Sequence, residues 1–257
     1  MIPTKENIAK MKAEALALQK NKIHKKISNT FIESAIKNNT ATALKTIYYL
    51  ANAIETIKDL NDLEPISLLT ITFDTREMLK YTELTLPEVK RNMKAMQETS
   101  ITFVNEAKKI EEGINLLPYY KFVYGKHKIE VKIFVKIARM IVDVKRNYSM
   151  VDTRTLMKLK SKHSLRLLPM LQRINQYSED IAKRKVFTLD ELNLLFGTKY
   201  KRFADIQRKV LDPVKSELDT HSRLSFIYEV DYDHFDAGRP KAVSITLDVI
   251  DSQPRLF

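Results

Sequence analysis

The feature that most constrains the fold is a strict alternation of apolar residues that follows helical segments in both halves of the chain. In the first half, Tyr119–Tyr124 and a Gly125-Lys126 turn lead into alternating apolar residues from Ile129 to Val135. In the second half, apolar residues alternate from Leu224 to Tyr232 and again from Val243 to Val249. A period of two predicts strands with one buried face. Each half is therefore expected to end in a β-hairpin.

The segments before the first hairpin show helical spacing and helix start signals. Residues 29–58 carry apolar stripes at the spacing of a helix, and 70–73 and 101–104 are short extended segments. Asp74 or Thr75 can cap one helix, and Thr85 precedes another whose first turn tolerates Pro87. The order predicted is helix, short strand, two helices and hairpin.

The second half repeats this order. Helices are expected at 151–160 and 163–176, with a break around Pro169. Thr188 and Glu191 form a capping box for a short helix that Gly197 ends, and a longer helix covers about 202–218. The chain is therefore predicted to be α+β, with two tandem winged-helix domains, each a helix-turn-helix followed by a hairpin wing.

The predicted boundaries divide the 257 residues into three parts. Residues 1–26 form a lysine-rich arm, 27–147 an N-terminal winged-helix domain and 148–257 a C-terminal one, joined near 146–150. A chain of this length suits about two domains. It has no cysteine, which excludes disulfide scaffolds and thiolate metal sites, and no apolar run that could span a membrane.

The net charge of +12 favours a polyanionic partner, with nucleic acid ahead of an anionic membrane. The charge is uneven, because Thr153–Arg173 holds several lysines and arginines and no acid. A solvated basic surface is the alternative interpretation. For membrane binding, the sequence offers no convincing amphipathic anchor beyond residues 5–20. The protein is expected in the bacterial cytoplasm.

The helix at 202–218 is the candidate for reading base pairs. Its apolar stripe contains Phe203, Ile206 and Val210, whereas Arg202, Asp205, Arg208, Lys209 and Asp212 lie on the other side. Arg202 and Arg208 could each bind guanine, and Asp205 could accept from cytosine or hold an arginine in position. A solvated helix with i,i+3 ion pairs remains the alternative. Pro213 is expected to kink the axis.

The other DNA-contacting candidates are basic or polar residues near this helix, in the basic stretch, at the second wing and in the first half. They are Lys199, Tyr200 and Lys201; Lys160, Ser161 and Lys162; Arg239 and Lys241; and Lys90, Arg91 and Lys94.

No catalytic, cofactor or metal site is predicted. A phosphate-binding Gly-x-x-x-x-Gly-Lys segment is absent, and no two histidines are close enough to form the pair that nicking enzymes use. Asp231-x-Asp233-His234 is better explained by solvated turn residues than by a metal site. His163 is expected near a phosphate or in helix packing rather than as a base.

Several ordered segments resemble the replication initiator (Rep) proteins of iteron-containing plasmids. They are Leu159-Lys160-Ser161-Lys162-His163-Ser164-Leu165-Arg166-Leu167, Phe187-Thr188-Leu189-Asp190-Glu191-Leu192, Tyr200–Pro213 and Gly238-Arg239-Pro240-Lys241. The resemblance covers about 155–250 and, by element order, 28–145. The sequence departs from the family at Leu168-Pro169, within a helix that is continuous in relatives.

The resemblance implies a protein without catalytic activity that binds double-stranded DNA, namely tandem origin repeats, as a monomer. Arg202, Asp205 and Arg208 match base-contacting positions, and Lys209 matches a backbone contact. It also implies dimers through the N-terminal domain that repress the protein's own operator, and recruitment of the host initiator and replicative helicase. A dedicated repressor of the same fold and a DNA-nicking enzyme are the alternatives.

Overall fold

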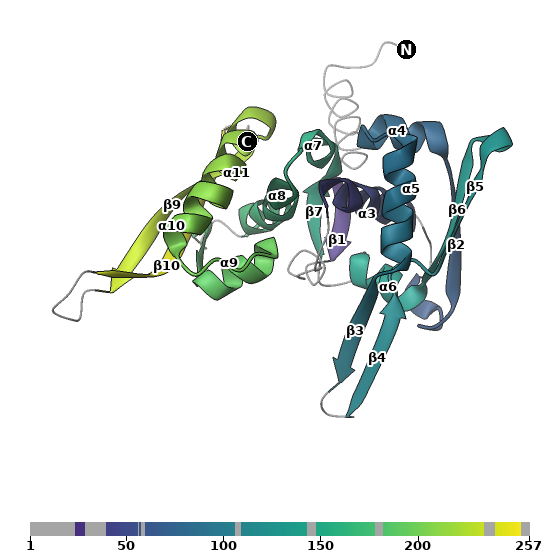
Figure 1. Cartoon of the computed structure of the whole chain (residues 1–257), viewed down its shortest axis with the longest axis horizontal. Helices are drawn as coiled ribbons and strands as arrows, with labels where there is room; N and C mark the ends of the chain where they lie inside the picture. The colour runs from purple at the N-terminus through teal and green to yellow at the C-terminus, as the bar shows by residue number, and fades with distance from the viewer. Residues whose placement is uncertain are drawn as a thin grey trace, which may run out of the picture.

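Two groups of helices and strands lie on either side of α8 (Lys162–Asn175) in the computed structural model of the chain (Figure 1). The structure describes residues 24–28, 40–55, 57, 60–105, 109–142, 148–177, 182–233 and 240–252. Most of the predicted N-terminal arm, residues 1–23, and the wing residue Arg239 lie outside these ranges.

The N-terminal group is built on a three-stranded antiparallel sheet in the order β2-β6-β5. Its elements are α3 (Ala41–Ile54), β2 (Leu68–Asp74), α4 (Thr75–Thr82), α5 (Leu86–Gln97), β5 (Tyr119–Val123) and β6 (Lys128–Phe134). Asp74 caps α4 by accepting from the Arg76 and Glu77 amides, and Thr85 with Glu88 forms a capping box on α5. The predicted hairpin and both predicted helix starts are confirmed.

A second hairpin in this group was not predicted in full. β3 (Ser100–Asn105) includes the expected extended segment, and it pairs with β4 (Ile110–Asn115), which the sequence pattern did not reveal. In the sequence this hairpin comes between α5 and β5. In Figure 1 it projects away from α6 (Val135–Ile141). Short 3-10 turns lie at Leu60–Asp62 and Tyr124–Lys126.

A further antiparallel pair joins the beginning of the described chain to its middle. β1 (His24–Ser28) pairs with β7 (Tyr148–Asp152), and Ile27 lies opposite Ser149. His24–Lys26, which the sequence assigned to the arm, therefore belong to a strand. Of the helix expected at 29–58, the described part is α3, which Thr40 caps by accepting from the Ala43 amide.

The C-terminal group contains the predicted helix-turn-helix and wing. After α7 (Thr153–Lys158) and α8 come β8 (Arg184–Phe187), α9 (Leu189–Phe196), α10 (Phe203–Ile206), a π turn (Gln207–Leu211), α11 (Asp212–His221), β9 (Leu224–Asp233) and β10 (Lys241–Asp251). The sheet order is β8-β10-β9, and β8 was not predicted. The two groups are two winged-helix domains, as predicted.

The predicted break at Pro169 is wrong, because α8 continues through this residue. A proline cannot donate to the carbonyl four residues before it, so Leu165 loses its helical partner. The Tyr48 hydroxyl from α3 donates to that carbonyl at 3.2 Å in a buried position. The helix is therefore kept continuous by a hydrogen bond from another element.

α8 is packed from both sides. It contacts α3 and β7 of the N-terminal group and α9, α11 and β9 of the C-terminal group. Tyr81 and Thr153 share a hydrogen bond of 2.6 Å, and the Lys45 ammonium donates to the Met157 carbonyl, so α7 is tied to the N-terminal group as well. None of the helices in the described ranges combines the length and the hydrophobicity of a membrane-spanning segment.

Candidate nucleic-acid interface

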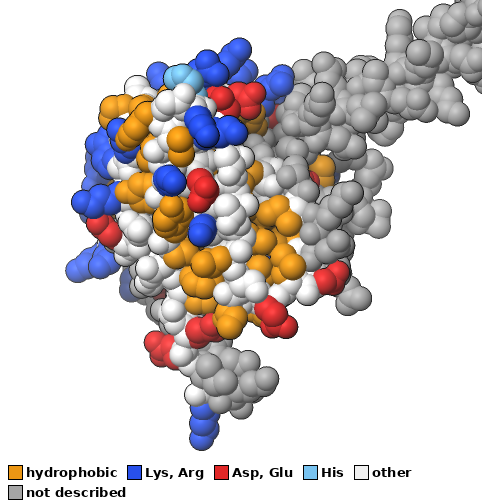
Figure 2. Space-filling model, turned by 90° about the vertical axis from the view of Figure 1, so that its right-hand side faces the viewer, with side chains coloured by type: hydrophobic (Ala, Val, Ile, Leu, Met, Phe, Trp, Pro, Cys, Tyr) orange, Lys and Arg blue, Asp and Glu red, His pale blue; other side chains and the backbone are white. Residues whose placement is uncertain are grey.

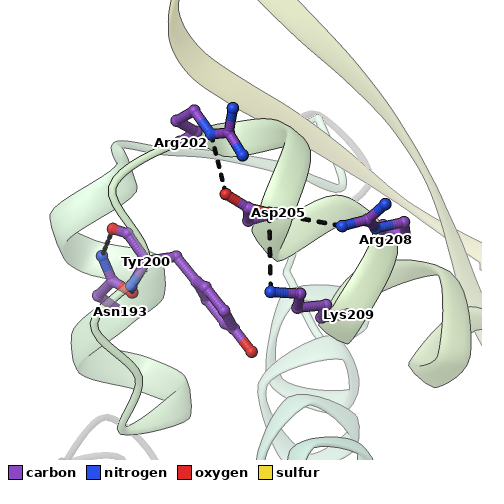
Figure 3. Close-up of polar contacts among 6 residues, drawn as sticks. All are labelled: Asn193, Tyr200, Arg202, Asp205, Arg208 and Lys209. Atoms are coloured by element: carbon purple, nitrogen blue, oxygen red, sulfur yellow. Dashed lines mark hydrogen bonds and ion pairs between the residues drawn. The ribbon is translucent and has the colours of Figure 1, made fainter.

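The turn between α9 and α10 is fixed by one side chain, Asn193. Its Oδ1 accepts from the Tyr200 amide and its Nδ2 donates to the Tyr200 carbonyl, each at 2.8 Å (Figure 3). The same Oδ1 also accepts from the Thr198 hydroxyl at 2.8 Å. Gly197 ends α9 at a φ of 63°, a conformation that glycine adopts without strain. These contacts set the direction in which α10 leaves the turn.

The apolar face of the second helix is buried as predicted. Phe203, Ile206 and Val210 are at most 7% exposed, and they belong to the hydrophobic core. The helix begins at Phe203, one residue later than expected, because Arg202 has extended backbone angles at the N-cap position. Its opposite face is left to solvent.

Asp205 lies at the centre of the exposed face and contacts three basic residues. Its carboxylate accepts from Arg202 Nε at 3.0 Å, and lies 3.7 Å from both an Arg208 guanidinium nitrogen and Lys209 Nζ (Figure 3). The hydrogen bond from Arg202, followed by the nearby positive charges, lowers the pKa of Asp205. These contacts therefore favour the ionised form of the carboxylate.

The i,i+3 ion pairs of the alternative interpretation are thus present, but they leave the arginines available. The Arg202 and Arg208 side chains are 76% and 74% exposed, whereas that of Asp205 is 16% exposed. A guanidinium has five N–H donors, and the contacts with Asp205 occupy only part of them. Asp205 therefore orients two forked donors that still face solvent.

Lys209 and Tyr200 are positioned together. The Lys209 ammonium lies 5.2 Å from the centre of the Tyr200 ring, within the range of a cation–π contact. Asn193 forms hydrogen bonds with the Tyr200 amide and carbonyl, so the backbone from which the Tyr200 ring extends is held in place. The lysines on either side of Tyr200, Lys199 and Lys201, are exposed.

Pro213 is accommodated by a π turn directly before it. The Asp212 amide donates to the Gln207 carbonyl, five residues back instead of four. A regular α-helix would press the proline ring against the Lys209 carbonyl, and the wider turn relieves that conflict. The sequence predicted a kink of the helix axis here; the structure shows a π turn, a feature at which helices commonly bend, and the kink itself stays a prediction.

Both ends of the π turn are fastened to the wing. The Tyr228 hydroxyl of β9 donates to the Asp212 carboxylate and also forms a hydrogen bond with Gln207. Burial, followed by the bond to Asp212, raises the pKa of Tyr228 to about 12. The phenol therefore stays protonated, and the reading segment is attached to the strand beside it.

The predicted phosphate contacts at the start of α8 have mixed surroundings. Lys160 is exposed, but its amide donates to the Glu217 carboxylate of α11 at 2.7 Å, and the Ser161 amide does so at 3.3 Å. The Ser161 hydroxyl accepts from the His163 amide and caps α8. The Lys160 and Ser161 amides are therefore occupied, and a phosphate contact by the Lys160 or Lys162 side chain stays a prediction.

His163 belongs to the packing of α8. Its ring meets Phe196 edge-on with 5.4 Å between centroids. Burial, followed by the charges of Lys162 and Arg166, lowers the pKa of His163 to about 4. The neutral imidazole is the form that fits this position.

The N-terminal candidates lie together on α5. Val89, Met93 and Met96 are buried, and Lys90, Arg91 and Lys94 are exposed. Lys90 Nζ lies 4.8 Å from the centre of the Tyr124 ring, at the turn between β5 and β6. A basic helix face and a wing turn therefore adjoin in this domain too.

Two further residues singled out in the sequence lie on the strands of the C-terminal wing, Lys241 on β10 and Asp231 on β9. Lys241 is exposed at the start of β10. The Asp231 carboxylate accepts from the Ser244 and Thr246 hydroxyls at 2.7 and 3.0 Å, which is a structural role. Among the described residues no group of three or more metal-ligating side chains occurs.

Three positioning residues escaped the sequence reasoning: Asn193, Glu217 and Tyr228. Each forms a hydrogen bond with a residue that lies seven or more positions away along the chain and is brought close by folding. Asn193 had one signal, because asparagine is unusual inside a helix unless its side chain bonds the backbone. Glu217 and Tyr228 had no local signal.

Comparisons with known proteins agree with this fold. A family model described as "Initiator Replication protein, WH1" matches residues 25–172, and one described as "Initiator Rep protein, WH2" matches 188–248. The solved structure titled "Crystal structure of Pi initiator protein in complex with iteron DNA" has a TM-score of 0.67 at 16% identity, covering 90% of this chain and 99% of that one. A comparison with curated proteins gives no match. The chain belongs to the family of plasmid replication initiator proteins with two winged-helix domains.

Proposed function

We propose that this protein binds the tandem repeats, or iterons, of a plasmid origin as a monomer, helps to open the origin and recruits the host initiator and replicative helicase. The observation that carries the proposal is the cluster around Asp205, in which two exposed arginines are oriented on the second helix of a helix-turn-helix. The matching solved structure is titled as a complex with iteron DNA. The protein would act on plasmid DNA in the bacterial cytoplasm.

In this proposal the C-terminal domain supplies most of the base reading. Arg202 and Arg208 each contact guanine through forked hydrogen bonds, and Asp205 accepts from cytosine or keeps the arginines in position. The phosphate contacts come from basic residues around the helix, at the start of α8 and on the wing: Lys199, Lys201, Lys209, Lys160, Lys162 and Lys241. Lys90, Arg91 and Lys94 of α5 add contacts from the N-terminal domain.

A second copy of the chain is the proposed partner for the N-terminal sheet. Figure 2 shows the side of the molecule on which this sheet lies, with hydrophobic side chains interspersed among charged ones. Ile66, Leu68 and Tyr119 are large exposed apolar residues on or beside β2 and β5. Such a surface favours a protein partner. The dimer would repress the protein's own operator, and the monomer would act at the origin.

Titration of the full chain with the cognate repeat and with random DNA tests the reading role. Arg202→Ala or Arg208→Ala is expected to cost about 1–3 kcal/mol on the repeat and much less on random DNA. Equal losses on both DNAs would make these arginines phosphate contacts only. Maintenance of a plasmid that depends on this gene separates an initiator from a dedicated repressor, because a repressor alone would not sustain replication.

A further inference from the structure

Arg166 is a buried arginine in the first half of α8, with 8% of its surface exposed. α8 packs against α9, the first helix of the C-terminal helix-turn-helix. One guanidinium nitrogen of Arg166 donates to the Leu195 carbonyl in the last turn of α9 at 2.6 Å. Leu195 is 5% exposed, so this hydrogen bond is shielded from water. The contact therefore joins α8 directly to the end of the helix that precedes the turn.

The contact falls where α9 runs out of its own donors. The last carbonyls of a helix have no partner within the helix. The Gly197 amide donates to the Leu194 carbonyl at 3.3 Å. The Thr198 amide donates to the Asn193 carbonyl at 2.9 Å. The Leu195 carbonyl is the next one along the helix, and a positive charge is favourable at this end of the helix dipole.

The guanidinium also lies beside the first residue of the turn. A Cβ added at Gly197 would lie 4.0 Å from a guanidinium nitrogen of Arg166. The turn continues from Gly197 to Tyr200, whose backbone Asn193 holds, and then to Arg202 at the start of α10. Arg166 thus acts on the beginning of the turn and Asn193 on its end.

α8 is a fixed support for this contact because its other side is joined to the N-terminal group. The Tyr48 hydroxyl of α3 donates to the Leu165 carbonyl, one residue before Arg166. Burial raises the pKa of Tyr48, and the charge of Arg166 acts against this rise, so the two side chains are close. Consecutive residues of α8 therefore contact α3 and α9.

Packing alone does not account for an arginine at this position. Removing a guanidinium from water costs free energy, which an apolar side chain of similar volume would avoid. In return the guanidinium supplies a directional hydrogen bond, which an apolar contact does not. Base reading depends on direction, because a forked contact to guanine requires two aligned hydrogen bonds at once.

We propose that Arg166 is a positioning residue for base reading: by binding the Leu195 carbonyl, it fixes the direction in which the turn and α10 leave α9. The inference rests on the proposed reading role of Arg202 and Arg208. Arg166 itself is buried and acts through the turn, so its loss should lower affinity for the cognate repeat and spare affinity for random DNA.

The test uses Arg166→Met in the full chain, which keeps an unbranched side chain and removes the donors. In titrations with both DNAs, the preference for the repeat should fall about tenfold, which is part of the discrimination that one forked arginine provides. The salt dependence should not change, because no phosphate contact is removed. Arg166→Lys keeps the charge and a donor, and it should recover part of the preference.

Hydrogen exchange gives a second measurement that does not depend on DNA. The amides from 195 to 203 should exchange faster in Arg166→Met than in the wild type, because the end of α9 and the turn open more readily. Arg139→Met is the matched control, since Arg139 of α6 likewise donates to backbone carbonyls, those of Leu60 and Leu63, but in the N-terminal group. It should change neither the preference nor the exchange at 195–203.

Unchanged exchange at 195–203 in Arg166→Met would overturn the proposal, and so would equal losses of affinity on both DNAs. A loss of preference in Arg139→Met of the same size would also overturn it, because general destabilisation would then explain the effect. If Arg166→Met does not fold, Arg166→Lys must show the same changes at smaller size. Wild-type protein that does not prefer the repeat would refute the proposed function, while the exchange measurement still decides whether Arg166 holds the turn.

Discussion

Tyr48 and Pro169 give the sharpest test of the structural reasoning. The Tyr48 hydroxyl donates to the Leu165 carbonyl at 3.2 Å, and Pro169 is the residue that deprives this carbonyl of its helical donor. Tyr48 is 3% exposed and Leu165 is fully buried, so water cannot replace the hydroxyl. Tyr48→Phe therefore leaves a buried carbonyl without a partner, which costs about 1–3 kcal/mol of the free energy of unfolding.

A double-mutant cycle isolates this contact from the other effects of each substitution. Pro169→Ala restores an amide that can donate to the Leu165 carbonyl within the helix, and it removes the cost of a proline in a helix interior. In the Pro169→Ala background, Tyr48→Phe should therefore cost much less than in the wild type. The expected coupling is about 1–2 kcal/mol, measured by urea unfolding followed by circular dichroism.

Equal costs of Tyr48→Phe in both backgrounds would refute the reasoning, since the carbonyl would then not depend on the tyrosine. Tyr49→Phe is the matched control. This neighbour on α3 packs edge-on against Phe73 at 5.4 Å, and its hydroxyl has no hydrogen-bond partner among the described residues. Its substitution should cost little and should not couple to Pro169.

Three further predictions concern the interface and its support. Asp205→Ala should change which base is preferred more than it changes affinity for random DNA; a uniform gain on every sequence would show Asp205 to be only a repulsive charge. Lys162→Ala should weaken binding to all sequences and reduce the salt slope by about one unit, and an unchanged slope would return this lysine to the solvated surface. The pKa of His163 is lowered to about 4, so its contribution to stability is present above its ordinary pKa and is lost as the pH falls from 6.5 towards 4. His163→Phe should flatten the fall in unfolding free energy over that interval, and an unaltered pH profile would contradict the assignment.

The features that the sequence predicted correctly are those determined within a few residues. The capping boxes at Thr85 and Thr188, the cap at Asp74 and the end of α9 at Gly197 each depend on neighbours in the chain. The buried stripe of the reading helix likewise follows from its own periodicity. Local chemistry thus predicted the helix-turn-helix and both wings.

The features that it missed depend on pairing between distant segments. β1 pairs with β7 across most of the N-terminal domain, and β8 joins the edge of the C-terminal sheet. β4 contains Glu111, Glu112 and Gly113, residue types that are uncommon in strands and typical of loops. This segment is a strand because it pairs with β3. A strand whose composition is polar is specified by its neighbour, and the neighbour cannot be read from the strand itself.

The two helix-interior prolines show how the same local signal leads to different structures. At Pro169 another element compensates, because the Tyr48 hydroxyl of α3 donates to the carbonyl that the proline leaves without a helical donor, and α8 continues. At Pro213 the helix itself changes, because the preceding turn widens to a π turn, and Tyr228 forms hydrogen bonds with Gln207 and Asp212 at its two ends. The first solution suits a helix buried between two domains. The π turn before Pro213 contains Arg208 and Lys209 and follows Arg202 and Asp205 in the sequence. The proline therefore helps to set the spacing of the side chains that we propose to read DNA.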